Sequence, residues 1–146
     1  MSTEQSNRQL ASDLRTVVSR LIKKLRHKST SAEKLSLTER STMALLDQHR
    51  ELLPGELAAM EKITSQSMSQ IIHHLLELGY IVRRISDTDK RKSIISLSRT
   101  GQAMLYKMRN ERDEWLSSAL MNACNARDQD MLRRAIGPLT RLVDFD

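Results

Sequence analysis

Residues 83–101 read RRISDTDKRKSIISLSRTG, and this stretch decides how the rest of the chain is interpreted. Apolar and polar residues alternate over 80–85 and again over 93–97, on either side of the charged run DTDKRK. Period-two alternation around a polar tip predicts a β-hairpin. The hairpin carries five cations and two carboxylates between residues 83 and 92, so we expect it to reach into a nucleic-acid groove. A solvated tip with ordinary surface charge is the alternative interpretation.

The preceding segment, residues 53–79, predicts two helices joined by a short turn. Pro54 suits the first position of the first helix, and Thr64 or Ser65 can cap the second, which ends at Gly79. The apolar face of the first helix consists of Leu57, Ala58 and Met60. The second helix has a stripe of apolar residues at helical spacing, which predicts a buried face: Met68, Ile71, Ile72, Leu75 and Leu76.

The opposite face of the second helix carries short amides and hydroxyls in place of the usual lysines and glutamates. We expect six of its residues to contact DNA: Ser65, Gln66, Ser67, Ser69, Gln70 and His73. Glutamine pairs with adenine through two hydrogen bonds in the major groove, and we expect the serines to make phosphate or water-mediated contacts. An ordinary surface amide is the alternative interpretation of Gln70.

Two helices followed by a basic hairpin are the order of a winged helix-turn-helix, and the chain resembles the MarR family (multiple antibiotic resistance regulators) of bacterial transcription factors. The family's wing pattern, D-x-[DN]-x-R and then L-[TS]-x-x-G, is found here as Asp87, Asp89, Arg91, Leu97, Ser98 and Gly101. The segments GELA and LLELGYIVR also fit, and the motifs cover roughly residues 35–105. This chain departs from the family at Gln70, where arginine is common, and at His73 and His74, which replace Asp-Arg. The base preference of better-known members is therefore not carried over.

The resemblance implies how the wing would contact DNA. Arg91 is the candidate for insertion into the minor groove, where a narrow groove concentrates negative potential. Asp89 would hold the guanidinium in place, although an exposed ion pair with no role in binding is the alternative. We assign five wing residues to the DNA-binding site: Asp87, Asp89, Lys90, Arg91 and Lys92.

Composition agrees with a small DNA-binding protein. The chain has 146 residues, a net charge of +6 and 39% hydrophobic residues, which suits one domain and a polyanionic partner. Only 3% of residues are aromatic, which argues against a single-strand or RNA-binding fold. No apolar run approaches about 18 residues, so we expect no membrane span. A single cysteine and an N-terminal stretch without an apolar signal region predict a cytoplasmic protein.

The remaining segments predict amphipathic helices that need a partner. Apolar residues recur at helical spacing from Leu10 to Leu25, and two more such helices follow the wing, one capped by Ser98 and the last beginning near Asp128. Thr38 can cap a further helix before the helix-turn-helix. Pro138 should kink or interrupt the last helix, because proline removes a hydrogen bond. The fold class is therefore mainly α with a small β-hairpin wing.

These boundaries define the expected organisation. The whole chain, 1–146, forms one MarR-like unit, in which 35–100 is the winged helix-turn-helix and 7–30 and 101–146 are dimerisation helices. The resemblance implies a homodimer whose terminal helices interlock, and a two-fold dimer would place two recognition helices on a pseudo-palindromic operator. The basic face of the first helix is expected to be solvated, with direct DNA contact as the alternative.

The sequence does not predict a metal site, a reactive cysteine or catalysis. His73 and His74 are adjacent and diverge by about 100° on a helix, so they cannot share a metal ion. Cys124 lacks a cluster of cations that would activate it, and we assign it to packing. We find no nucleophile elbow, phosphate loop or paired carboxylates, and we expect no enzyme activity, cofactor or metal.

The sequence therefore predicts a dimeric regulator that binds specific double-stranded DNA, and the resemblance favours a repressor, although the sequence itself does not distinguish a repressor from an activator. The resemblance implies release by a small ligand, since MarR-like proteins often bind aromatic acids or lipophilic compounds. The alternative is a winged-helix interaction module whose basic wing binds an acidic protein partner.

Overall fold

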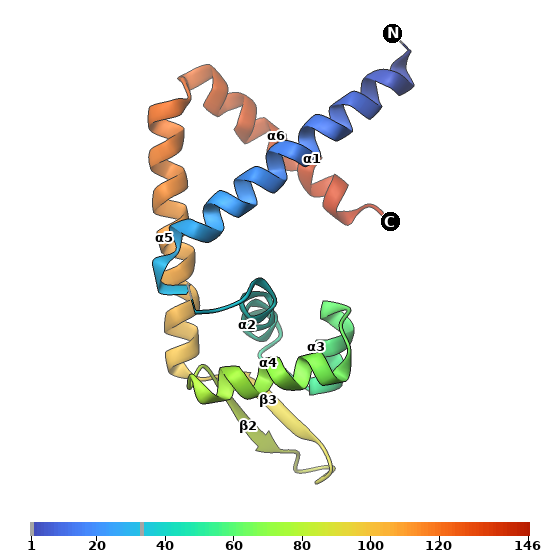
Figure 1. The fold of residues 1–146 in the computed structure, drawn as a ribbon, viewed down its shortest axis with the longest axis vertical. Helices are drawn as coiled ribbons and strands as arrows, with labels where there is room; N and C mark the ends of the chain where they lie inside the picture. The colour runs from blue at the N-terminus through green and yellow to red at the C-terminus, as the bar shows by residue number, and fades with distance from the viewer. Residues whose placement is uncertain (1, 33) are drawn as a thin grey trace. The chain divides into compact units, whose positions relative to one another are not determined.

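The computed structural model describes residues 2–32 and 34–146, and the chain forms two compact units (Figure 1). The winged unit is Ser29–Asn110, and the terminal-helix unit consists of the residues up to Lys28 together with Glu111–Asp146. Helix α5 (Arg99–Ala123) contributes its first half to the winged unit and its second half to the other. The division between the units thus falls inside a helix, where no loop or change of composition marks it.

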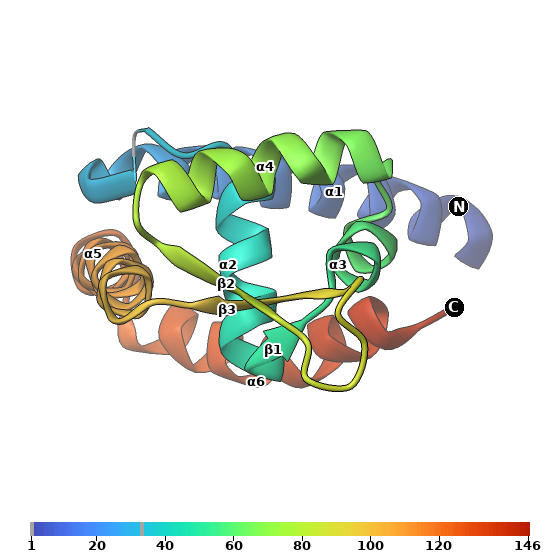
Figure 2. The same ribbon diagram turned by 90° about the horizontal axis from the view of Figure 1, so that it is seen from below.

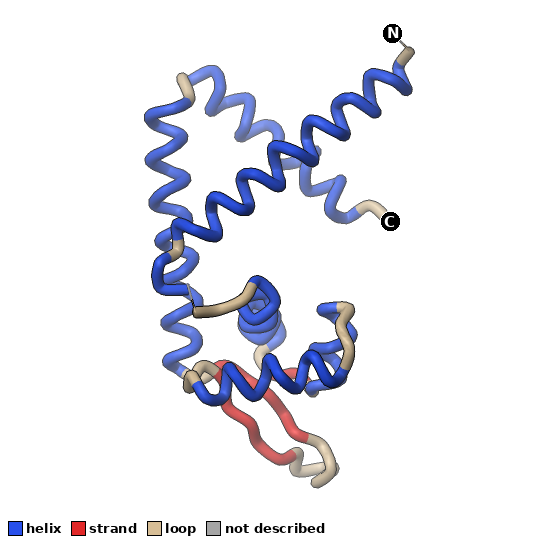
Figure 3. The backbone as a smooth tube through the Cα atoms, viewed as in Figure 1, coloured by secondary structure: helices blue, strands red, loops and turns tan. Residues whose placement is uncertain are grey.

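The winged unit contains the helices and strands expected of a winged helix-turn-helix, coloured by type in Figure 3. Its elements before α5 are a short 3-10 helix (Thr30–Ala32), α2 (Leu37–His49), β1 (Glu51–Leu52), α3 (Pro54–Glu61), α4 (Ser65–Glu77), β2 (Ile81–Ile85) and β3 (Ser93–Leu97). The strands form one antiparallel sheet in the order β1-β3-β2. The predicted helix-turn-helix and hairpin are confirmed, and β1 is an addition that the sequence did not predict.

The hairpin register places Ile81 and Ile95 on the core, whereas Val82 and Ile85 are exposed. Ile81 pairs with Leu97, and Ile85 pairs with Ser93, so the tip begins immediately after Ile85. Ile81 and Ile95 lie on the same face and are buried, since side chains alternate between the two faces of a strand. The outer end of the hairpin extends beyond the core, with the tip as the loop joining β2 to β3 in Figure 2.

The core of the winged unit is built from every one of its larger elements. Its fully buried apolar side chains are Met43 and Leu46 from α2, Leu57 from α3, Met68, Ile72 and Leu75 from α4, Ile95 from β3, and Leu105 and Met108 from α5. Three of them belong to the predicted five-residue stripe of α4, and the other two, Ile71 and Leu76, are partly buried against the same core. The opposite face of α4 is thereby held toward solvent. The prediction that Met60 belongs to the buried face of α3 is wrong. Met60 is 43% exposed, because α3 buries only Leu57 and Ala58.

A second correction concerns the start of α2. The helix begins at Leu37 and its cap is Ser36, where Thr38 was predicted. The Ser36 hydroxyl accepts from the Glu39 backbone N–H at 3.1 Å, and the Glu39 carboxylate accepts from the Ser36 N–H at 2.8 Å. This reciprocal capping box satisfies two orphan donors and therefore outcompetes a cap at Thr38.

The wing joins α5 through a close backbone approach. Ser98 caps α5, as predicted: its hydroxyl accepts from the Gly101 N–H at 2.9 Å and donates to the Gly79 carbonyl at 2.6 Å. A Cβ atom on Gly101 would lie 1.9 Å from the Tyr80 carbonyl oxygen, a distance that only glycine avoids. The L-S-x-x-G part of the wing pattern therefore fixes the base of the hairpin against α5.

The terminal-helix unit has long helices with little buried surface. It contains α1 (Thr3–Lys28), the second half of α5 and α6 (Ala126–Asp144). α1 and α6 have no buried residue among those described. Their exposed apolar side chains include Leu10, Val17 and Ile22 on α1 and Leu132, Ile136, Leu142 and Val143 on α6. Helices α1 and α6 begin earlier than predicted, and α6 is capped by Asn125. Pro138 does not interrupt α6, so the predicted interruption is wrong.

Candidate nucleic-acid interface

Helix α4 presents the predicted polar face to solvent. All six residues assigned to DNA contact are exposed: Ser65, Gln66, Ser67, Ser69, Gln70 and His73. The Thr64 hydroxyl caps the helix by accepting from the Ser67 N–H at 3.0 Å, and it donates to the Ser67 hydroxyl at 2.9 Å. The remaining N–H groups of this first turn, with the positive end of the helix dipole, suit a backbone phosphate.

His73 has a partner on its own helix. Its Nε2 atom lies 3.0 Å from the Glu77 carboxylate one turn away, and both side chains are well exposed. Such an exposed pair is worth little, about 0–1 kcal/mol at most, so the contact leaves His73 able to turn toward a base or phosphate.

A contact not predicted from the sequence holds the other side of α4. His74 Nδ1 is hydrogen-bonded to the Glu39 carboxylate, the same group that completes the α2 capping box. Burial raises the pKa of Glu39, but the Ser36 N–H and His74 stabilise the charged form, and the net result is a pKa below its usual value of 4.5. Glu39 thus fixes the start of α2 and the last turn of α4 with one carboxylate.

His73 and His74 therefore diverge to different carboxylates, as their adjacency predicted. In residues 2–32 and 34–146, no three His, Cys, Asp or Glu side chains gather as a metal ion would require. Cys124 is partly buried after the last turn of α5.

At the wing tip, Arg91 and Asp89 lie together as the resemblance implied. The Asp89 Oδ1 atom accepts from the Arg91 backbone N–H at 3.1 Å and from its Nε–H at 3.3 Å. The same N–H, and then the guanidinium, lower the pKa of Asp89, so the carboxylate stays charged. Arg91 is 90% exposed, whereas Asp89 is 30% exposed. The aspartate is fixed in the tip and the arginine projects from it.

Ser86 organises the tip, although the sequence did not identify it as a site residue. Its backbone N–H donates to the Lys92 carbonyl at 2.9 Å, and its hydroxyl accepts from the N–H groups of Thr88 and Asp89, both at 3.3 Å. The side chain is buried, with 8% of the residue exposed. This Ser-turn replaces the Gly or Asn that tight hairpins commonly use.

The part of the wing next to its tip is fixed by a second long-range pair. Nη2 of Arg84 lies 3.1 and 3.0 Å from the two carboxylate oxygens of Glu51, joining β2 to β1 across β3. The positive charge of Arg84 is thereby neutralised by Glu51. Asp87, Lys90 and Lys92 are exposed. Within the described part of the chain, Lys90 and Lys92 form no ion pair. Two unpaired cations of the wing therefore lie at its tip.

Comparison with known proteins shows to which family this winged helix-turn-helix belongs. The sequence profile of the MarR family matches residues 34–92, from the approach to α2 to the wing tip. An HTH-type transcriptional regulator of Mycobacterium leprae is 32% identical over 139 residues, which are 95% of this chain and 96% of the relative. The chain belongs to the MarR family.

Solved structures agree with this MarR-family assignment. A transcriptional regulator from Pseudomonas aeruginosa is 30% identical and superposes with a TM-score of 0.87 over 96% of this chain and 98% of its own. A mutant of Escherichia coli MarR in complex with operator DNA has the same fold, with a TM-score of 0.64 and 14% identity over 95% of this chain and 99% of that one. The protein is thus a transcriptional regulator and not an enzyme. No helix in the described residues is long and apolar enough to cross a membrane.

Proposed function

We propose that this MarR-family regulator binds a specific double-stranded site as a homodimer and represses transcription until a small ligand releases it. Helix α4 reads bases in the major groove, and Arg91 enters the adjacent minor groove. The exposed face of α4 carries the proposal, since it offers amides and hydroxyls where a solvated helix would carry charge. Because its partner is DNA, we place the protein in the cytoplasm.

Exposed apolar side chains support the homodimer. On α6, Ile136 is 63% exposed and Val143 is 82% exposed, and on α1 Val17 is 59% exposed. An apolar surface of this extent needs a partner in water, and the predicted partner is a second copy. Two copies would present two α4 helices about one helical turn of DNA apart, which is why the operator should be a pseudo-palindrome.

Base reading is tested with Gln70→Ala and, as a matched control, Gln48→Ala, an exposed glutamine on α2. We expect Gln70→Ala to cost about 1–3 kcal/mol on the specific site and much less on random DNA. The Gln48 variant should bind both like the unaltered protein. Fluorescence anisotropy on DNA from upstream of the coding region, first mapped by footprinting, measures both. Equal losses on specific and random DNA would contradict base reading.

The same titrations separate the alternative function. A module that binds an acidic protein would show weak DNA binding without a footprint. A DNA-binding regulator shows a footprint and an affinity that falls steeply with salt, because each phosphate contact releases a counterion.

A further inference from the structure

One carboxylate joins α4 to the start of α2. The Glu39 Oε1 atom accepts from the Ser36 N–H at 2.8 Å, and its Oε2 atom is hydrogen-bonded to His74 Nδ1. The Glu39 side chain is 9% exposed and that of His74 is 41% exposed, so water only partly reaches the contact. A partly buried pair of this kind is screened less than a surface pair and holds the two helices together more firmly.

His74 lies beside the face of α4 that we propose reads bases. It follows Gln70 by four residues, and residues at this spacing are neighbours on a helix. The first turn of α4 is fixed by the Thr64 cap and the last turn by His74. Because both ends are held, the polar side chains between them are presented in one orientation, as paired hydrogen bonds to a base edge require.

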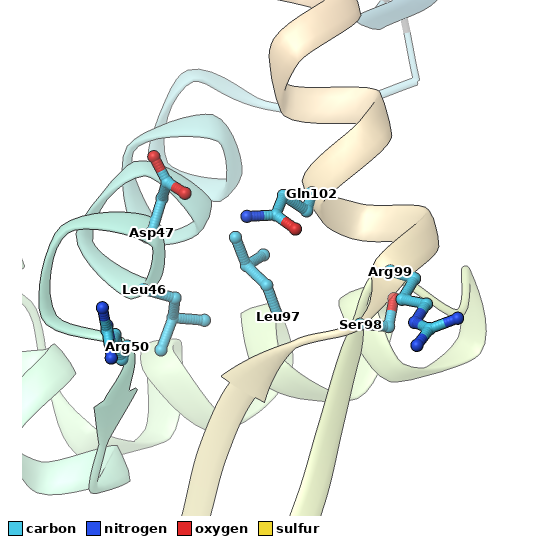
Figure 4. A pocket seen from close by; sticks show the side chains of 7 residues that line it. All are labelled: Leu46, Asp47, Arg50, Leu97, Ser98, Arg99 and Gln102. Carbon is cyan, nitrogen blue, oxygen red and sulfur yellow. The ribbon is translucent and has the colours of Figure 1, made fainter.

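The charged surroundings of His74 are simple. Helix α4 packs mainly against α2, α3 and β2. The charged or titratable residues of these three elements are Glu39, Arg40, Asp47, His49, Glu56, Glu61, Arg83 and Arg84. Of these, Glu39 is the one that forms a hydrogen bond or ion pair with His74 within the described residues. Asp47 lines a pocket at the opposite end of α2 (Figure 4), and on α4 itself His73 pairs with Glu77.

The imidazole makes the strength of the contact depend on pH. The pKa of Glu39 lies below its usual value of 4.5, so its carboxylate stays charged in the neutral range. A histidine ordinarily changes its charge at about pH 6.5. With a protonated ring, the contact is an ion pair with a charge-assisted hydrogen bond, about twice as strong as a neutral one. The contact therefore weakens as the pH rises through the range in which the imidazole loses its proton.

We propose that Glu39 and His74 are positioning residues for base reading, whose contact holds α4 in its reading orientation more firmly in mild acid than in mild alkali. Neither residue needs to touch DNA, because both act through the polar side chains that α4 presents. This inference rests on the proposed DNA-binding function and adds a dependence on pH to it.

The test measures the affinity of the full-length protein for its footprinted operator and for random DNA at about pH 6 and about pH 8. Long-range charge changes both affinities, whereas the orientation of α4 affects only the operator, because random DNA is held through phosphate contacts. We expect the ratio of operator affinity to random affinity to be about three- to tenfold higher at the lower pH.

Two substitutions separate this pair from other titrating groups. Arginine stays charged across the range and can still pair with Glu39, so His74→Arg should keep the higher ratio at both pH values, within about twofold. Glu39→Gln removes the charge, so at the lower pH its ratio should fall to the value that the unaltered protein has at the higher pH. His49→Arg, the same substitution at an exposed histidine of α2, is the matched control and should keep the unaltered pH profile.

Circular dichroism at each pH establishes that every variant is folded before its affinity is compared, and His74→Lys replaces His74→Arg if the latter does not fold. Three results would overturn the inference: an equal ratio at the two pH values in the unaltered protein, a full pH dependence in His74→Arg, or an unchanged ratio at the lower pH in Glu39→Gln. The absence of any footprinted operator would contradict the proposed function itself, and this inference with it, so the two failures are distinguishable.

Discussion

The winged unit and the terminal-helix unit differ in how far they bury their own apolar residues. Helix α4 buries Met68, Ile72 and Leu75 almost completely within its own unit. Helix α6 has the same kind of apolar stripe, yet none of its residues is buried within the chain. The comparison indicates that the winged unit is stabilised by its own core, whereas the terminal helices would be stabilised by a second copy in the homodimer proposed above.

The sharpest test of this difference is one substitution made in each unit. Gly101→Ala should destabilise the protein by about 3 kcal/mol or more, because its Cβ would meet the Tyr80 carbonyl and the backbone there must move. Gly137→Ala on α6 meets only the end of the Arg141 side chain, at 3.7 Å. It should stabilise the helix by about 0.5–1 kcal/mol, the usual gain for alanine over glycine.

Urea unfolding of both variants measures these changes. A loss of stability in Gly137→Ala comparable to that in Gly101→Ala would contradict the comparison, since it would mean that α6 is packed as closely as the base of the wing.

The second prediction concerns the apolar surface of α6. Ile136→Asp should abolish the dimer of 16.8 kDa chains, because burying an unpaired carboxylate between two copies costs several kcal/mol, about 3 or more. The winged unit should stay folded, since Ile136 belongs to the other unit. Light scattering reports the mass and circular dichroism reports the helices. Asp144→Asn, a polar change near the end of the same helix, is the control and should remain dimeric. A folded monomer formed by the unaltered protein at micromolar concentration would contradict the homodimer itself.

The third prediction concerns the Glu39–His74 contact in the winged unit. A carboxyl group whose pKa is lowered by folding stabilises the protein above its unfolded pKa, and this contribution is lost as the pH falls through the lowered value. Glu39→Gln keeps a capping-box side chain but removes the charge. It should cost about 1–2 kcal/mol at pH 7, and the difference from the unaltered protein should shrink as the pH falls below about 4.5.

Urea unfolding at several pH values checks this, with Glu77→Gln, at the exposed His73 pair, as the control that should change little. A difference that is independent of pH would mean that the Glu39 charge has no part in holding α4.

The sequence predicted the contacts between residues that are close in the chain and missed the contacts between residues that are far apart in it. The α4 cap at Thr64, the apolar stripe and the Ser98 cap all join residues within one or two turns, so periodicity and spacing identify them. The His74–Glu39 and Arg84–Glu51 contacts join residues 35 and 33 positions apart. Nothing in either local segment indicates such a pair before the fold is known.

Strand β1 was missed for a related reason. It has only Glu51 and Leu52, too few residues for an alternating pattern, and it exists because β3 offers a free edge. The Ser36 cap was missed because Thr38 lies close by and is equally suited by residue type. The choice depends on Glu39 reaching back to Ser36, which completes the capping box.

The smallest expected effect belongs to the wing tip, the most exposed part of the winged unit. Arg91→Ala should weaken specific binding and lower the salt slope by about one for each protomer that contacts DNA. Arg91→Lys should not restore binding, because an ammonium is more strongly hydrated than a guanidinium and lacks its planar fork. The loss of DNA affinity in these two Arg91 variants is the reference for the effect of changing Asp89.

Asp89→Ala decides whether the wing is an ordered DNA-binding device or only a charged surface. Removing a carboxylate from a DNA-contacting tip should tighten binding if long-range charge were the only term. The structure gives Asp89 a second role, because its Oδ1 atom holds both the backbone N–H and the Nε–H of Arg91. We therefore expect binding to weaken about two- to fivefold, the range of an exposed ion pair, through loss of order in Arg91.

Asp87→Ala, which removes the same charge from the same tip without that contact, is the matched control and should bind slightly more tightly. Anisotropy titrations at several salt concentrations measure both variants. Tighter binding by Asp89→Ala would show that the aspartate only repels DNA and that Arg91 needs no support from it.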